Sequence, residues 1–294
     1  MKAAFQGVHG AYSELASKQL LGQSIATLPC ESFQDVFDAV AAGKAARGIL
    51  PIENSLAGSI HQNYDLLLAR KLHIVGEAYL KVEHVLMCHP STSLSAIRQV
   101  RSHPQALAQC SHFFAKTKRI KAAPYFDTAG AAESLVQEAP KDIGAIASSY
   151  AAGLYGLKVL KRNLQNSADN FTRFLAVAKL PLPKTAGGAG FKTSIAFMPK
   201  RNAVGSLHAV LGVFAERGID LFKIESRPNP LSPFEYWFYA DLAGSPADPA
   251  VAPALKKLAG LTSDLRILGG YPRATRTSGT ARAAGAAVPV KPRR

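Results

Sequence analysis

The stretch KAAFQGVHGAYSELASKQLLG, residues 2–22, sets the pattern of the first 180 residues. Residues 2–8 predict a strand, residues 12–22 predict a helix, and a glycine-containing turn joins them. The same order continues along the chain, which is the pattern of an α/β layer structure. The next predicted elements are strand 24–29, helix 32–43, strand 47–52 and helix 59–69.

A second set of elements follows. Residues 73–88 are long and β-like, and 143–148 predict another strand. The predicted helices of this set are 93–99, 104–116 and 128–139. Two such sets predict two lobes with a cleft between them.

The composition changes at residues 181–190, where Pro and Gly predict a linker. The order beyond it is strand, helix, strand, strand, helix, strand, which is the split βαβ of ferredoxin-like modules. These elements are predicted at 191–199, 206–218, 219–228, 234–244, 249–260 and 265–272. Residues 273–294 are rich in Ala, Gly, Pro, Thr and Arg and predict a disordered basic tail.

The formal charge of +15 indicates a basic surface rather than a nucleic-acid partner. Six of the 35 basic residues lie in the last 22 residues, which leaves 29 basic and 20 acidic residues before them. No helix-turn-helix or zinc-finger pattern accompanies the charge. Three scattered cysteines predict neither a disulfide framework nor a metal site, and they suit a reducing cytoplasm. No apolar stretch has the length of a membrane helix.

Five short segments occur in the order that is typical of one enzyme family. They are Phe5–Glu14 (FQGVHGAYSE), Pro51–Ser55 (PIENS), Ser102–Leu107 (SHPQAL), Asn170–Phe174 (NFTRF) and Glu225–Pro228 (ESRP). Together they resemble the prephenate dehydratase family over Ala3 to about Pro272. One five-residue motif would be a weak signal, but five in register are a strong one.

The resemblance implies a two-lobed, periplasmic-binding-protein-like catalytic domain followed by a ferredoxin-like βαββαβ ACT domain. The catalytic domain is expected at 1–180, with lobe one at about 1–75 and 161–180 and lobe two at about 76–160. The linker at 181–190, the ACT domain at 191–272 and the tail at 273–294 complete the expected organisation.

The resemblance also implies an activity: a monofunctional enzyme that converts prephenate to phenylpyruvate by loss of water and CO2. No metal or cofactor is expected, and phenylalanine is the expected feedback effector. Several segments look very like plant arogenate dehydratases, so formation of phenylalanine from arogenate is an alternative. A non-catalytic amino-acid sensor is a third reading. Thr172 beside Arg173 favours an enzyme, because a mere binder has no use for that hydroxyl.

The chemistry explains why Thr172 and Arg173 are the expected catalytic residues. Elimination from a dianion needs a fixed cation, donors aimed at carboxylates, and a donor near the leaving hydroxyl. The planar guanidinium of Arg173 can bind a carboxylate in a bidentate manner. The family resemblance places Thr172 at the hydroxyl, as a hydrogen-bond donor or proton relay. The alternative is a Thr in an ordinary strand beside an edge Arg.

Further residues are expected to bind substrate. Ser13 begins a helix where free N–H groups bind anions, although plain N-capping explains it equally well. His103 opens another helix and could contact substrate or be structural. The full expected set is Ser13, Asn54, Ser55, Ser102, His103, Gln105, Ser148, Asn170 and Phe174.

The ACT domain is expected to bind phenylalanine through two segments and to join subunits as a homodimer or homotetramer. The segments are Gly205, Ser206 and Leu207, and then Glu225, Ser226, Arg227 and Pro228. Ser206 and His208 depart from the apolar residues usual in the first segment. No nucleic acid or membrane is expected as a partner.

Overall fold

The computed structural model describes residues 1–183, 187, 190–201, 203–229 and 232–275. Most of the predicted tail at 273–294, and half of the predicted linker at 181–190, lie outside these residues. The helices are α1 (Tyr12–Leu21), α2 (Phe33–Ala41), α3 (His61–Ala69), α4 (Pro104–Gln109), α5 (Ser111–Lys116), α6 (Thr128–Glu138), α7 (Ser149–Leu154), α8 (Ser206–Ala215) and α9 (Val251–Leu261).

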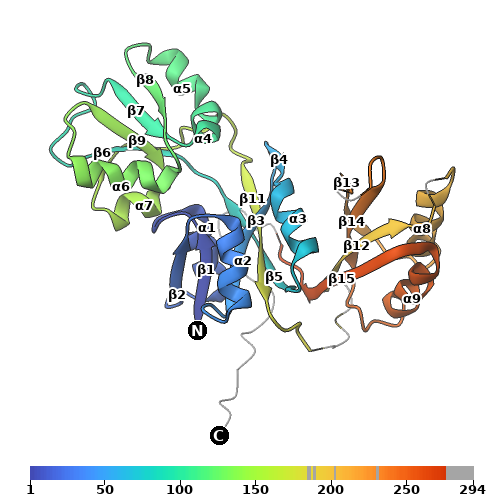
Figure 1. The fold of residues 1–294 in the computed structure, drawn as a ribbon. Helices are drawn as coiled ribbons and strands as arrows, with labels where there is room; N and C mark the ends of the chain where they lie inside the picture. The colour runs from blue at the N-terminus through green and yellow to red at the C-terminus, as the bar shows by residue number, and fades with distance from the viewer. Residues whose placement is uncertain (184–186, 188–189, 202, 230–231, 276–294) are drawn as a thin grey trace, which may run out of the picture. The chain divides into compact units, whose positions relative to one another are not determined.

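The strands form three sheets (Figure 1). They are β1 (Lys2–Gln6), β2 (Ala26–Cys30), β3 (Arg47–Asn54), β4 (Gly58–Ser59), β5 (His73–Lys81), β6 (Val85–Cys88), β7 (Gln99–Ser102), β8 (Lys121–Pro124), β9 (Ile143–Ala147), β10 (Lys158–Lys161), β11 (Phe171–Ala178), β12 (Phe191–Pro199), β13 (Leu221–Pro228), β14 (Tyr236–Ala243) and β15 (Thr262–Pro272).

The first sheet has the order β2-β1-β3-β11-β5, with the short β4 paired to β3. β1 runs parallel to both β2 and β3, as the alternation of strands and helices predicts. Phe5 and Ile49 are fully buried, because helices α1 and α2 pack on these strands. β11 comes late in the chain yet lies between β3 and β5. The segment with the NFTRF motif therefore returns to the first sheet.

The second sheet has the order β10-β6-β9-β7-β8 and is mixed, with β6 antiparallel to both of its neighbours. Helix α6 packs against β9 and β7, and its buried Ala131, Ala132 and Leu135 join the core of this sheet. Ser102, at the end of β7, is fully buried and donates to the Ile146 carbonyl at 2.6 Å.

The predicted helix at 93–99 was wrong, since residues 94–96 form a turn and Gln99 begins β7. Leu94 is 40% exposed, so no apolar stripe forms there. The turn carbonyls are satisfied by arginines instead: Arg98 and Arg119 both donate to the Ser95 carbonyl. The predicted helix at 104–116 is divided into α4 and α5 at Cys110.

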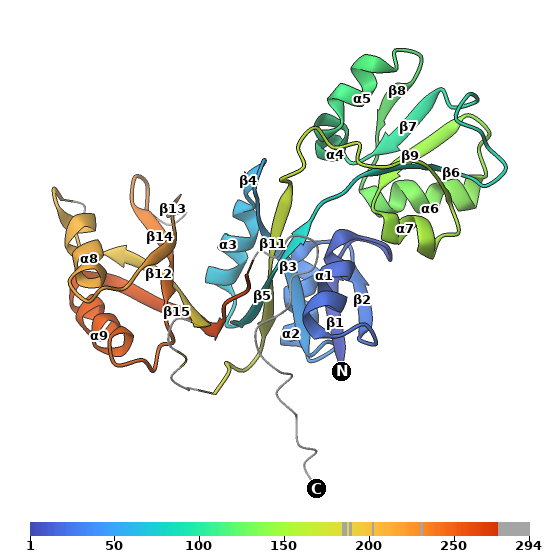
Figure 2. The same ribbon diagram turned by 180° about the vertical axis from the view of Figure 1, so that it is seen from behind.

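The third sheet has the order β13-β14-β12-β15, and it confirms the predicted βαββαβ order. Helices α8 and α9 cover one face through a core that includes Phe197, Phe214 and Leu258 (Figure 2). Helix α3 lies on the other side, where the ring of Tyr64 packs on the ring of Tyr239 at 4.9 Å.

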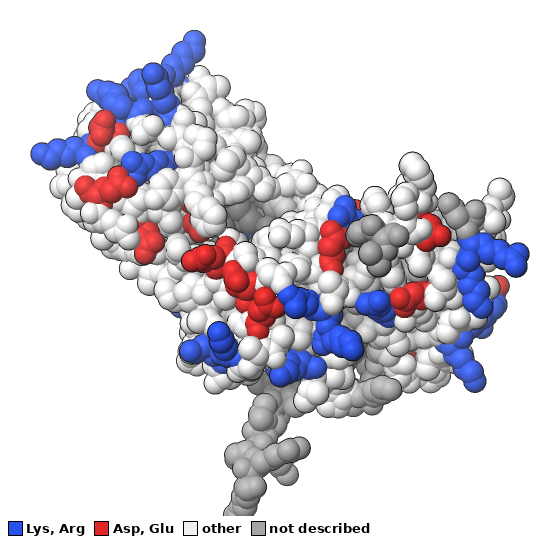
Figure 3. All heavy atoms as spheres, viewed as in Figure 1, with Lys and Arg blue, Asp and Glu red and all other residues white. Residues whose placement is uncertain are grey.

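Contacts divide the chain into two compact units, residues 1–60 with 79–174 and residues 61–78 with 175–294. Helix α3 therefore groups with the third sheet. None of the described helices is long and apolar enough to cross a membrane. On the face in Figure 3, Lys and Arg lie among Asp and Glu rather than in one continuous stripe.

Candidate active site

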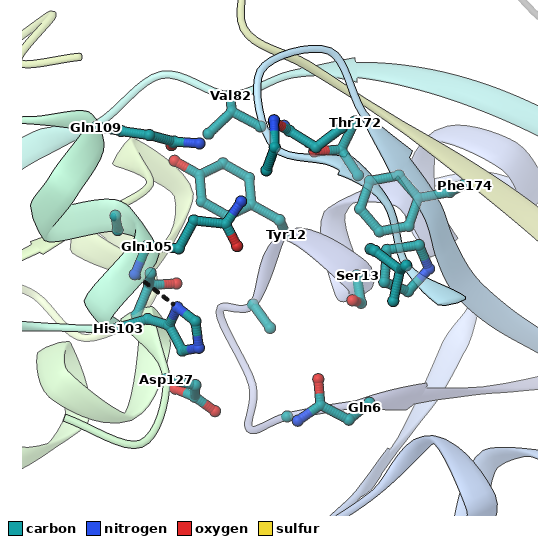
Figure 4. A pocket seen from close by; sticks show the side chains of 18 of the residues that line it. Gln6, Tyr12, Ser13, Val82, His103, Gln105, Gln109, Asp127, Thr172 and Phe174 are labelled. Atoms are coloured by element: carbon teal, nitrogen blue, oxygen red, sulfur yellow. Dashed lines mark hydrogen bonds between the residues drawn. The ribbon is translucent and has the colours of Figure 1, made fainter. Parts of the chain in front are cut away.

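A cavity of about 330 Å³ opens in the first unit, and most of the predicted motifs contribute to its wall (Figure 4). Its residues come from the β1–α1 loop, the end of β3, the β4 turn, helix α4, the start of α6, and β11. The predicted residues among them are Ser13, Asn54, His103, Gln105, Thr172 and Phe174. Segments as far apart in sequence as Gln6 and Phe174 thus meet at one cavity.

Five other predicted residues are not among the lining residues, and four of them hold the wall in place. Ser55 bridges to β11, donating to the Asp169 carbonyl at 2.8 Å and accepting from the Phe171 N–H at 2.9 Å. Ser148 caps α7 and donates to the Gly10 carbonyl at 3.3 Å. Ser102 joins β7 to β9, as described above. Asn170 belongs to the hydrogen-bond chain described below.

Arg173 is the fifth of these residues and is 5% exposed. Successive side chains of a strand point to opposite faces, so Arg173 points away from the face that Thr172 and Phe174 share. The lining residues of the cavity include no Lys or Arg. The geometry does not support Arg173 as a direct carboxylate clamp, and that role stays a prediction.

Tyr12, His84, Gln109 and Asp127 line the cavity but were absent from the predicted set. Gln109 lies one helical turn after Gln105, so the i, i+4 spacing on α4 could have indicated it. Asp127 precedes helix α6 and is recognisable in the sequence only as an N-cap. No local pattern around His84 distinguishes it from a structural histidine.

A chain of hydrogen bonds crosses the cavity wall, and the backbone fixes its direction. The N–H groups of Leu56 and Ala57 both donate to Asn54 Oδ1 at 3.0 Å. Asn54 must therefore use its Nδ2 as the donor to Asn170 Oδ1 (2.8 Å) and to Thr172 Oγ1 (3.0 Å).

The chain continues from Asn170 toward Tyr12. Asn170 Nδ2 donates to Gln109 Oε1 at 2.9 Å. The Nε2 of His84 lies 3.1 Å from the same oxygen, so this nitrogen carries a proton. His84 Nδ1 then has no proton and accepts, so the Tyr12 hydroxyl shares its single proton between the Glu83 carbonyl at 2.7 Å and Nδ1 at 3.1 Å.

These directions leave the Thr172 hydroxyl with its own proton to donate. Its oxygen accepts from Asn54, and the residue is 8% exposed in the wall of the cavity. A hydroxyl that already accepts one bond is free to donate its proton to a ligand. Thr172 is therefore positioned as a hydrogen-bond donor, and its place at a leaving hydroxyl stays a prediction.

The titratable members of the chain are neutral near pH 7. Burial lowers the pKa of His84, although the Gln109 contact opposes the shift. Burial raises the pKa of Tyr12 well above its usual value, and the neighbouring Cys110 and Glu83 add to the effect. The wall thus offers uncharged donors in fixed orientations.

Helix α1 presents backbone donors to the cavity. Its N-cap, Ala11, has no capping side chain, and the N–H groups of Tyr12 and Ser13 have no acceptor in the described part of the chain. Such a helix start favours a carboxylate. Glu14 does not line the cavity. Burial would raise the pKa of Glu14, but hydrogen bonds from Gly10, His9 and Thr27 outweigh burial and lower it.

The two predicted effector segments lie in the second unit. Gly205 begins α8 with φ +82°, a conformation that favours glycine. Glu225 and Arg227 extend from β13 to helix α3. Glu225 lies 3.1 Å from His61, and Arg227 pairs with Asp65 at 2.7 Å.

Comparisons with known proteins agree with the motifs. Residues 3–181 match the prephenate dehydratase family and residues 201–260 match the ACT domain. The chloroplastic arogenate dehydratase/prephenate dehydratase 2 of Arabidopsis thaliana is 45% identical over 282 residues, covering 92% of this chain and 73% of its own.

Two solved structures have the same fold at a TM-score of 0.85. Prephenate dehydratase from Arthrobacter aurescens, in complex with L-Phe, is 30% identical and covers 93% of this chain and 90% of its own. GqqA, described as a novel type of quorum quenching acylase, is 37% identical and covers 92% and 98%. The predicted resemblance is confirmed: this chain belongs to the prephenate dehydratase family and carries a C-terminal ACT domain.

Proposed function

We propose that this chain is a decarboxylating dehydratase that acts on prephenate or arogenate and is regulated by phenylalanine. The observation that carries the proposal is the orientation of Thr172, whose oxygen is occupied by Asn54 and whose proton is free. The family assignment and the relatives named above support the same reaction.

The geometry suits the elimination. As the ring carboxylate leaves as CO2, its bonding electrons enter the ring and the bond to the ring hydroxyl breaks. A proton is taken up as the hydroxyl departs as water. Thr172 would donate to that oxygen, while the N–H groups at the start of α1 would hold a substrate carboxylate. Phe174 and Val82 supply an apolar wall.

An acylase reaction, named for one structural neighbour, needs a nucleophile activated by a base. The contact of Thr172 Oγ1 is the amide of Asn54, which is no base. The geometry therefore favours proton donation by Thr172.

The decisive experiment incubates the purified protein separately with prephenate and arogenate. Phenylpyruvate should form from prephenate, or phenylalanine from arogenate. If neither substrate gives a product, the non-catalytic amino-acid sensor becomes the favoured interpretation.

Regulation is proposed to act through helix α3. Phenylalanine would bind near Gly205–Leu207 and Glu225–Pro228, at a contact between ACT domains of a homodimer or homotetramer. Arg227 and Glu225 hold α3, and α3 begins at His61, directly after the cavity residue Ile60. An effector that prefers one arrangement of these pairs would change the cavity edge through this connection.

A cytoplasmic location is proposed from the free cysteines, two of which are buried.

A further inference from the structure

The Asp127 carboxylate, in the wall of the cavity, has a hydrogen-bond partner among the described residues at only one of its two oxygens. Asp127 caps helix α6, and its Oδ1 accepts from the Gly130 N–H. Its Oδ2 is buried and has no hydrogen-bond partner within the described residues. Capping alone needs a single oxygen, and a neutral Ser or Asn serves as well. The second oxygen remains to be explained, because a buried polar atom without a hydrogen-bond partner is costly.

No positive side chain of the cavity neutralises this group. The lining residues contain neither Lys nor Arg. His103, on the same side of the cavity in Figure 4, uses its Nδ1 to accept from the Gln105 N–H at 3.2 Å. None of the described residues pairs with Asp127 Oδ2, so a ligand can supply its partner, and a cation is the group most complementary to a carboxylate oxygen.

Asp127 lies beside the free backbone donors of helix α1. A Cβ built on Gly7 would lie 3.3 Å from Asp127 Oδ2 and 3.3 Å from Ala11 Cβ, so these three groups adjoin one another. Gly7 has φ +109°, and a side chain there would crowd Oδ2, so the absence of one lets Gly7 pack closely against the carboxylate. The N–H groups of Tyr12 and Ser13, for which the described residues provide no acceptor, follow Ala11 directly. An anion site and a cation site are thus neighbours.

We propose that Asp127 binds the ammonium group of the substrate, with the adjoining carboxylate held at the start of α1. An α-amino acid head has these two groups on one carbon, whereas a 2-oxo acid has only the carboxylate. Arogenate carries the amino acid and prephenate carries the oxo acid. The site therefore selects arogenate, and the product is phenylalanine. The inference rests on the proposed dehydratase function and names its substrate.

The position of Thr172 agrees with this assignment. In arogenate the ring hydroxyl is para to the carbon that bears the amino-acid side chain, so the two groups lie at opposite ends of the molecule. In the view of Figure 4, Thr172 and Asp127 lie on opposite sides of the cavity. Arogenate bound with its head at Asp127 would direct its hydroxyl toward Thr172.

The test compares kcat/KM for both substrates in the wild type, Asp127→Asn and Asp127→Ser. Both substitutions keep a capping oxygen and remove the charge. With arogenate, kcat/KM should fall about 10- to 100-fold, mainly through KM, as expected for loss of one charge-assisted hydrogen bond. With prephenate, it should stay within about threefold, because this substrate has no ammonium to lose.

Asp35→Asn is the matched control, because Asp35 belongs to the capping box of α2 and does not line the cavity. It should leave the ratio of the two activities unchanged. Equal losses on both substrates in the Asp127 variants, or an unchanged arogenate rate, would overturn the assignment. A wild type that converts neither substrate would instead remove the proposed function. Melting curves for each variant separate a folding defect from a binding defect.

Discussion

The cavity wall and the contact between α3 and β13 are built from different kinds of interaction. In the wall, Asn54, Asn170, His84 and Thr172 are at most 8% exposed, and the bonds between them are neutral. At α3, the His61–Glu225 and Asp65–Arg227 pairs join side chains that are 23–50% exposed. The wall network is buried and fixed in direction, whereas the α3 contacts are accessible to solvent and include the charged Asp65–Arg227 pair.

The difference indicates two different tasks. A buried hydrogen-bonded network is pre-organised, so its donors need no rearrangement when charge develops on a ligand. Exposed ion pairs contribute only about 0.2–1 kcal/mol each and are screened by salt. Such pairs can be exchanged for effector contacts at little cost. The first arrangement suits catalysis and the second suits regulation.

Removing the donor of the cavity should have the largest effect. Thr172→Ala should lower kcat about 10²- to 10⁴-fold, the usual contribution of a positioned proton donor. Thr172→Ser, which keeps the hydroxyl beside Asn54, should recover most of this loss. Steady-state kinetics with saturating substrate measures both. Similar kcat values for the Ala variant and the wild type would remove Thr172 from the mechanism.

The next largest effect should be on stability, at a buried ion pair in the second unit. Lys192 and Glu77 are 2.9 Å apart and nearly inaccessible, and Glu77 also accepts from the Ala274 N–H at 3.1 Å. Lys192→Met should cost about 3–5 kcal/mol, because it leaves a carboxylate buried without its cation. Urea unfolding measures the loss.

The exposed Lys257–Glu216 pair provides the control for this experiment. Lys257→Met should leave the urea midpoint unchanged, since solvent replaces the lost partner. Equal midpoints for both Lys variants would show that burial of the Lys192 pair has no energetic weight.

The sequence predicted most elements because hydrophobic periodicity is a local property. Helix 128–139 and strand 191–199 are confirmed almost to the residue as α6 and β12. The turn at 94–96 was missed because part of its hydrogen bonding comes from Arg119, more than 20 residues away, which donates to the Leu94 and Ser95 carbonyls. Strand alternation alone would have placed Thr172 and Arg173 on opposite faces.

The parts of the site that escaped prediction depend on contacts between distant segments. Asn54 and Asn170 are 116 residues apart in sequence, and only the return of β11 beside β3 brings them together. Asp127 is recognisable in the sequence as an N-cap. Its unpaired oxygen becomes visible only when Gly7 and helix α1 are placed beside it.

A smaller effect is expected from the buried His84 as pH falls. Burial lowers the pKa of His84 in the folded state. Below the ordinary histidine pKa of about 6.5, the unfolded chain therefore binds a proton that the folded chain does not. Stability is fully present above that pH and is lost toward the folded pKa, by at most about 1.4 kcal/mol per pH unit.

His84→Gln should reduce this loss. Urea midpoints at pH 7.5 and pH 5.5, compared between wild type and variant, isolate the contribution of His84. The lowered pKa of Glu14 acts in a separate window, since it contributes stability that is lost only as pH falls below the ordinary carboxyl range. An identical pH dependence in both proteins would show that His84 takes up its proton in the folded state at its ordinary pKa.

The smallest effect on stability should come from the contact between α3 and β13. Asp65→Asn removes the charge partner of Arg227 and should change the unfolding free energy by at most about 1 kcal/mol, less at high salt. The substitution should weaken inhibition by phenylalanine clearly even though the unfolding free energy changes little, because α3 connects β13 to the cavity residue Ile60. We expect phenylalanine to bind the variant but to inhibit it less.

Calorimetry and inhibition curves separate the two roles of this contact. If Asp65→Asn weakens inhibition while phenylalanine binding persists, the ion pair transmits the signal. If Asp65→Asn lowers phenylalanine affinity as much as Arg227→Ala does, the pair serves mainly to shape the effector site. Unchanged phenylalanine binding and unchanged inhibition in Asp65→Asn would contradict a role for this contact in regulation. The α3–β13 contact and the cavity wall would then differ in solvent exposure but not in task.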